Sequence, residues 1–130
     1  MASLKLMQPQ EVEVLYILPA LRREITIEMK KLGIEQKEIA NRLCVTEAAV
    51  SQYLKSKRAS KVKFSKTALS LIKTSAKKIK DRRMMLKETQ DLLKILKKQG
   101  SICKVHKELA DLPKQCLVCF TSEKEICKHQ

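Results

Sequence analysis

Apolar residues recur along much of this chain at intervals of three, four and seven, the spacing of amphipathic α-helices. We expect two helices near the N-terminus, one starting at Pro9 and one at Pro19, because proline fits a first helical turn. The apolar face of the first helix is predicted to be Val14, Leu15 and Leu18. The second is predicted to end at Gly33, with apolar positions at Leu21, Ile25, Ile27, Met29 and Leu32.

Two shorter helices are predicted over 36–43 and 47–55, joined by the turn Cys44-Val45-Thr46. Thr46 is a residue type that caps helix N-termini. Apolar or small side chains occupy the positions where two such helices must pack, namely Ile39, Ala40, Leu43, Val45, Val50 and Tyr53. This spacing indicates a helix-turn-helix. Cys44 stands where such a turn usually has a glycine with positive φ, so we expect about 1 kcal/mol of strain there.

Residues 65–99 contain no glycine or proline, and Gly100 then stops the run. The segment is either one long helix or two shorter ones. Ile72, Ile79, Leu86 and Leu93 recur every seven residues, a heptad-like stripe over about three heptads. It would pair two copies of the chain as a coiled coil, or pack back on the N-terminal helices. We favour dimerisation through this segment, since proteins with a helix-turn-helix usually bind DNA operators that consist of two half-sites.

Charge is concentrated in the same segment. The chain has 130 residues and a net charge of +14. Residues 61–100 carry 13 basic and 3 acidic side chains, against 10 and 7 in residues 1–60 and 5 and 4 in residues 101–130. Such an excess attracts polyanions. The cations off the stripe form either a solvated face or a phosphate track: Lys73, Lys77, Lys78, Lys80, Arg82, Lys87, Lys94, Lys97 and Lys98.

Composition supports an all-α chain, because turn residues and aromatics are few. We expect a helix-turn-helix domain over 1–60, a basic helix or helical hairpin over 61–100 and a small Cys-rich, metal-binding tail over 101–130. No apolar run approaches the ~18 residues needed to span a bilayer. Residues 1–10 lack the pattern of a signal peptide. We therefore expect a cytoplasmic protein with no membrane partner.

The tail holds four of the five cysteines, Cys103, Cys116, Cys119 and Cys127. Two residues between Cys116 and Cys119 let both thiolates face one metal ion, and His106 or His129 could replace a cysteine. An iron–sulfur cluster suits one such pair with dispersed partners. A structural zinc takes the same ligands but usually from two pairs. Incidental or redox-active thiols without metal are the third reading, and we favour the iron–sulfur cluster.

The segments 17–24, 33–40 and 46–54 together resemble a group of small archaeal transcriptional regulators. In sequence they read Ile-Leu-Pro-Ala-Leu-Arg-Arg-Glu, Gly-Ile-Glu-Gln-Lys-Glu-Ile-Ala and Thr-Glu-Ala-Ala-Val-Ser-Gln-Tyr-Leu. These regulators have a lambda-repressor/Cro-type helix-turn-helix and a Cys-containing C-terminal tail. The similarity covers residues 9–58 and, through the Cys pattern, 100–120. It implies sequence-specific binding to double-stranded DNA, as a homodimer.

In a helix-turn-helix the second helix enters the major groove with its N-terminal residues at base edges. The expected base contacts are Thr46, Glu47, Ala48, Ser51, Gln52 and Lys55. Gln52 has the amide that pairs with adenine, and Ala48 suits a thymine methyl. The expected phosphate contacts are Gln36, Lys37, Lys57, Arg58 and Lys61.

The sequence thus predicts a dimeric transcriptional regulator whose cysteine cluster senses redox state or iron. The alternative is a zinc-stabilised regulator or protein-interaction module without a sensing role. We expect no enzyme and no small-molecule substrate, because the chain has no phosphate-cradling glycine loop and no assignable nucleophile or acid pair.

Overall fold

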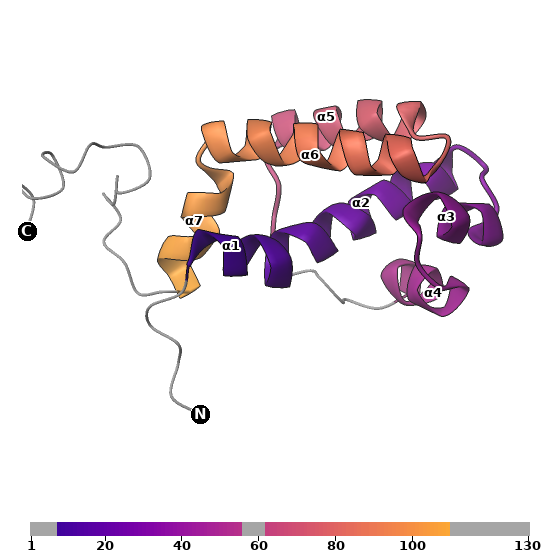
Figure 1. Ribbon diagram of the computed structural model, residues 1–130, viewed down its shortest axis with the longest axis horizontal. Coiled ribbons are helices and arrows are strands. Elements are labelled where there is room, and N and C mark those ends of the chain that lie inside the picture. Colours follow the sequence, from indigo (N-terminus) through magenta and orange to yellow (C-terminus); the bar gives the residue numbers. More distant parts are fainter. Residues whose placement is uncertain (1–7, 56–61, 110–130) are drawn as a thin grey trace, which may run out of the picture.

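The computed structural model describes residues 8–55 and 62–109, and all regular structure in these stretches is helical (Figure 1). This confirms the all-α prediction for the described part of the chain. The elements are α1 (Pro9–Val12), a π-helical turn η1 (Glu13–Ile17), α2 (Leu18–Lys31), α3 (Gln36–Leu43), α4 (Glu47–Lys55), α5 (Lys66–Lys78), α6 (Arg82–Lys98) and α7 (Ser101–Leu109). Among them, no helix is both long and apolar enough to cross a membrane.

Helix α2 begins at Leu18, one residue before the predicted start at Pro19, and it follows α1 and η1 without a break in the chain's helical course. Pro19 lies inside the first turn of α2 and has no N–H to donate. The π-turn accommodates this, since the Leu18 N–H donates to the Glu13 carbonyl, five residues back. The extra residue also rotates the apolar face. Val12 and Ile17 are buried, whereas Val14 and Leu15, which were expected on the apolar face, are 60% and 56% exposed.

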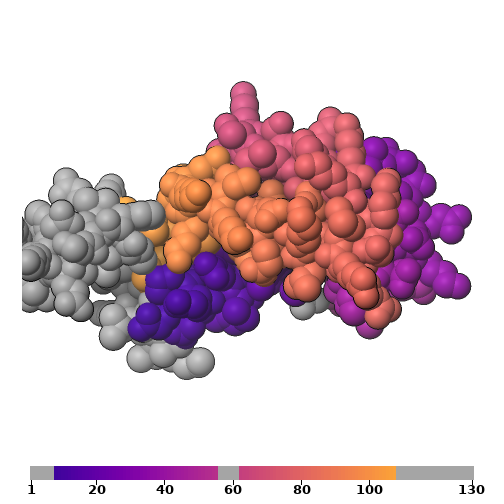
Figure 2. Space-filling view, turned by 45° about the horizontal axis from the view of Figure 1, so that its top comes forward, coloured from indigo at the N-terminus to yellow at the C-terminus, as the bar shows by residue number. Residues whose placement is uncertain are grey.

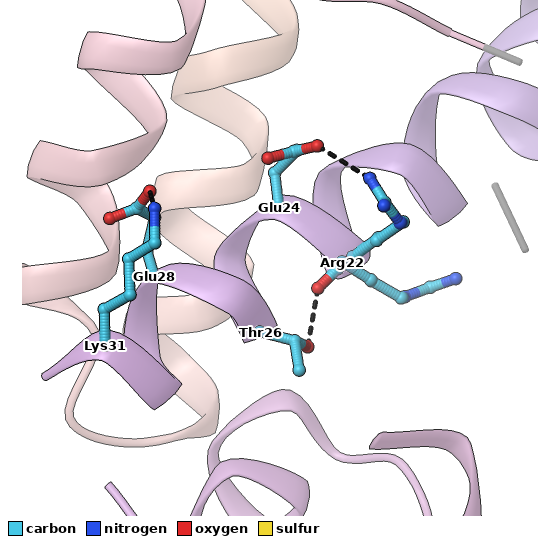
Figure 3. A network of polar contacts seen from close by, with 6 residues as sticks. Arg22, Glu24, Thr26, Glu28 and Lys31 are labelled. Atoms are coloured by element: carbon cyan, nitrogen blue, oxygen red, sulfur yellow. Dashed lines mark hydrogen bonds and ion pairs between the residues drawn. The ribbon is translucent and has the colours of Figure 1, made fainter. Parts of the chain in front are cut away.

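Helix α2 is the central element of the described fold. Its buried face is Leu21, Ile25 and Met29, at the predicted spacing. The buried Thr26 hydroxyl donates to the Arg22 carbonyl at 2.7 Å, which satisfies a polar group that would otherwise destabilise the core (Figure 3). Exposed and half-buried ion pairs flank this face, with Arg23 bonded to Glu24 and Lys31 to Glu28.

The segment 65–99 forms two helices, so the single long helix and its coiled-coil seam are wrong. A single helix is interrupted at Asp81, because the Asp81 carboxylate accepts the Met84 N–H at 2.8 Å and caps the N-terminus of α6. The heptad stripe is accordingly divided. Ile72 and Ile79 are buried, whereas Leu86 is 68% exposed. The alternative interpretation, a hairpin that packs back on the N-terminal helices, is the observed one (Figure 1).

The hairpin of α5 and α6 covers one side of α2, and α4 lies on the other side (Figure 1). One cluster of buried side chains extends from Val12 through Ile25, Ile39 and Ile72 to Leu96 and Ile102. It therefore joins helices on both sides of residue 60. Figure 2 shows α6 as a broad outer surface, with α5 above it in this view and α3 and α4 at one end.

Candidate nucleic-acid interface

Helices α3 and α4 begin and end at the predicted residues, with the predicted three-residue turn between them. Cys44 has φ 57° and ψ 45°, so the expected left-handed conformation is confirmed at a residue other than glycine. The turn aligns the two helices through two local bonds. The Val45 N–H donates to the Ala40 carbonyl at 3.0 Å, and the Thr46 hydroxyl oxygen accepts the Ala49 N–H at 3.1 Å, as predicted for a cap.

Helix α4 has two opposite faces. Val50 and Tyr53 are buried against the rest of the fold. At 100° per residue, Ala48, Gln52 and Lys55 lie on the far side of the helix, and all three are exposed. Thr46 and Glu47 are also exposed, and Ser51 is half-buried at the edge of this face. Five of the six residues predicted to contact bases therefore lie on α4, and Thr46 caps it. Three of them form its far side, and Glu47 lies in the first turn, where a carboxylate complements the helix dipole.

The residues predicted to contact phosphate are only partly described. Gln36 and Lys37 begin α3, where Gln36 is half-buried and Lys37 is exposed. Lys57, Arg58 and Lys61 lie outside the described residues. The described part of the predicted interface is thus α4 together with the start of α3.

Two arginines fix α3 to the turn of the hairpin. Arg42 donates from Nε to a Glu38 oxygen at 2.9 Å and from a terminal nitrogen to the Ile79 carbonyl at 3.2 Å. Arg82 lies within 3.4–3.5 Å of the Asn41 backbone and side-chain oxygens. These contacts hold the helix that orients α4. Sequence reasoning missed both roles, although Glu38 and Arg42 stand at an ion-pairing interval.

The nine predicted off-stripe cations of the hairpin are all exposed. One of them, Lys87, has acidic partners, with Asp91 at 3.2 Å and Glu88 at 3.7 Å. The hydrogen bond that Lys87 donates to Asp91 and the negative charge of Asp91, with a smaller contribution from Glu88, raise the pKa of Lys87 above its ordinary value. The ammonium group of Lys87 stays charged at neutral pH, so Asp91 and Glu88 neutralise the positive charge at this one point of a basic surface.

The tail cluster lies mostly outside the described residues, which include only Cys103 of the four predicted cysteine ligands. Cys103 and His106 are three residues apart on α7, and both are half-buried. Cys116, Cys119, Cys127 and His129 lie outside the described residues. Within the described ranges no group of three or more His, Cys, Asp or Glu side chains could hold a metal ion. The structure thus describes one sulfur of the predicted set.

A search with the whole chain matches no family model, no curated protein and no solved structure.

Proposed function

We propose that this protein is a transcriptional regulator that binds duplex DNA sequence-specifically, with α4 reading base edges in the major groove. The observation that carries the proposal is the pair of opposite faces on α4. One face anchors the helix through Val50 and Tyr53, and the other presents Ala48, Gln52 and Lys55 to solvent. A helix held this way has the exposed ridge of small and polar side chains that base readout requires.

The surroundings of α4 support the same proposal. A helix-turn-helix needs its first helix held rigidly, and Arg42 and Arg82 bind α3 to the hairpin turn from two sides. Lys37 is exposed at the start of α3, where a phosphate contact is expected. A net charge of +14 supplies the electrostatic part of DNA affinity, which does not depend on sequence.

The experiment is a site selection from random duplexes, followed by titrations of the selected duplex and of an unrelated one. We expect Gln52→Ala to weaken binding to the selected duplex by about 1–3 kcal/mol, the value of a bidentate base contact. Binding to the unrelated duplex should be nearly unchanged. The matched control is Gln10→Ala, which removes an exposed glutamine from α1. Equal losses on both duplexes would remove Gln52 from base readout.

Dimerisation stays part of this proposal on the ground that operators are usually paired half-sites. The heptad-like stripe does not form the dimer contact, because Ile72 is 1% exposed within one chain and Leu86 lies outside the core. Sedimentation of the protein with and without the selected duplex tests the dimer. A monomer at micromolar concentration that binds its duplex one to one would contradict it.

We propose in addition that the tail cysteines hold an iron–sulfur cluster, with zinc as the alternative metal. The spacing of Cys116 and Cys119 supports this, and Cys103 and His106 lie on α7, which reaches residue 109. A bound cluster would supply thiolate-ligated iron whose oxidation state follows the redox state of the cell. The role of this chain's residues is to provide the sulfur ligands.

A further inference from the structure

Helix α6 presents a second charged surface, which we name the outer face of α6. Helix α6 buries Met85, Leu92 and Leu96 against the fold. At 100° per residue the opposite side carries five exposed cations, and these define the outer face: Arg83, Lys87, Lys94, Lys97 and Lys98. From residue 83 to residue 98 the face runs about 22 Å along the helix.

The acids near this face do not neutralise it. Residues 62–98 contain twelve lysines and arginines but three acids. Asp81 accepts a backbone N–H as the cap of α6, while Glu88 is 4% exposed. Glu88 and Asp91 both lie beside Lys87. The other four cations of the outer face therefore have no acidic partner among the described residues.

The outer face of α6 points away from the surface that reads bases. Helix α4 packs on α2 and α3 and turns Ala48, Gln52 and Lys55 away from them. The hairpin lies across α2 from α4 (Figure 1), and α6 forms the outermost layer there (Figure 2). A straight duplex lying against α4 would thus leave the outer face of α6 uncovered.

We propose that the outer face of α6 binds the phosphate backbone of a second DNA duplex, so that one protein molecule bridges two duplex segments. A duplex carries one charge per about 1.7 Å of its axis, so a segment as long as this face presents about 13 phosphate charges. The bridging rests on the proposed function of α4, whereas duplex binding by the outer face of α6 does not.

The composition of the face favours duplex DNA over other polyanions. Single strands are usually held by stacking on aromatic side chains, and neither α5 nor α6 contains one. Anionic membranes are bound by helices that also insert apolar or aromatic residues. A protein interface has an apolar centre, whereas the residue between the cations on this face is Gln90, and the exposed Leu86 lies at its edge.

The test uses two full-length variants that each lose three positive charges. The first replaces Arg83, Lys94 and Lys98 of the outer face by glutamine. The matched control replaces Lys30, Lys31 and Lys104, which are exposed on α2 and α7, by glutamine. Glutamine has nearly the helix propensity of lysine and arginine, so both variants should keep the helical circular dichroism of the wild type.

Two readouts follow. In titrations with duplex of unrelated sequence at several salt concentrations, the outer-face variant should lower the slope of log K against log salt by about 2 to 3, because each lost phosphate contact removes about 0.9. In a capture assay the selected duplex is fixed to beads and a labelled second duplex is added. Wild type and control should retain the second duplex, and the outer-face variant should retain at least tenfold less while its affinity for the bead-bound duplex stays within threefold.

Capture by the outer-face variant equal to that by the control overturns the proposal. Parallel loss of bead-bound affinity and of capture also overturns it, because the outer face would then belong to the α4 site. A slope change on duplex RNA but not on duplex DNA overturns it as well. If Gln52→Ala changes nothing while the outer-face variant still lowers the slope on duplex DNA, the α4 proposal fails and duplex binding by the outer face stands.

Discussion

Replacing Cys44 by glycine is expected to stabilise the protein. At φ 57° and ψ 45° this residue is in the left-handed region, which costs a side chain with a Cβ about 1–2 kcal/mol. Glycine removes that cost, but it raises the conformational entropy of the unfolded chain, which lowers the free energy of unfolding by about 0.5–1 kcal/mol. The Cys44 side chain is exposed, so little packing is lost. The free energy of unfolding should therefore rise by up to about 1.5 kcal/mol, with about 0.75 kcal/mol as the middle of the range.

Urea denaturation followed by circular dichroism measures this change. With a slope of about 1–3 kcal/mol/M, the midpoint of Cys44→Gly should rise by a few tenths of a molar. The opposite substitution, Gly33→Ala, is the control. Gly33 has φ 83°, and an added Cβ would meet no atom within 4 Å, so its expected loss of about 1 kcal/mol is a backbone effect alone. A midpoint for Cys44→Gly at or below the wild type, with an unchanged slope, would refute the strain at this turn.

Three further predictions concern the core, the basic surface and the tail. Ile72→Ala should lower the free energy of unfolding by about 2–5 kcal/mol, whereas Leu86→Lys should change it by less than about 0.5 kcal/mol. The reverse order of the two losses in urea denaturation would support a coiled coil through the heptad-like stripe. Asp91→Asn should bring the pKa of Lys87 back towards its ordinary value in an NMR titration. Because that pKa is raised in the folded state, the stability from the pair is present below the ordinary pKa and is lost as pH rises through the raised one; an unmoved pKa would contradict the assigned cause. Full-length protein purified without oxygen should be coloured and should contain iron and sulfide. The substitution Cys116→Ser should lower the iron and sulfide content, and a colourless protein with zinc alone would rule the cluster out.

Local signals explain why the two helices of the predicted interface were placed correctly. Thr46 has a hydroxyl that caps α4, and the apolar spacing from Ile39 to Tyr53 leaves one arrangement in which both helices bury a face. The left-handed turn at Cys44 followed from its position between them. Each of these signals lies within a few residues of the feature that it predicts.

The errors arose where one pattern suits two structures. A heptad spacing is the same in a coiled coil and in a hairpin, and the feature that separates them is the cap at Asp81, which ends one helix and starts another. Near the N-terminus, the π-turn before Pro19 shifted the buried face by one residue. The bond from Arg42 to the Ile79 carbonyl joins residues 37 apart, beyond the reach of local patterns.

Sequence-specific binding by α4 is the central claim, and the ratio of two dissociation constants tests it most directly. The constants are those of the wild-type protein for its selected duplex and for a shuffled duplex of the same length and composition, measured at one physiological salt concentration. We predict a ratio of about 10³ or more in favour of the selected duplex, as specific DNA-binding proteins show. Equal constants for the two duplexes would contradict the claim and leave only charge-driven binding.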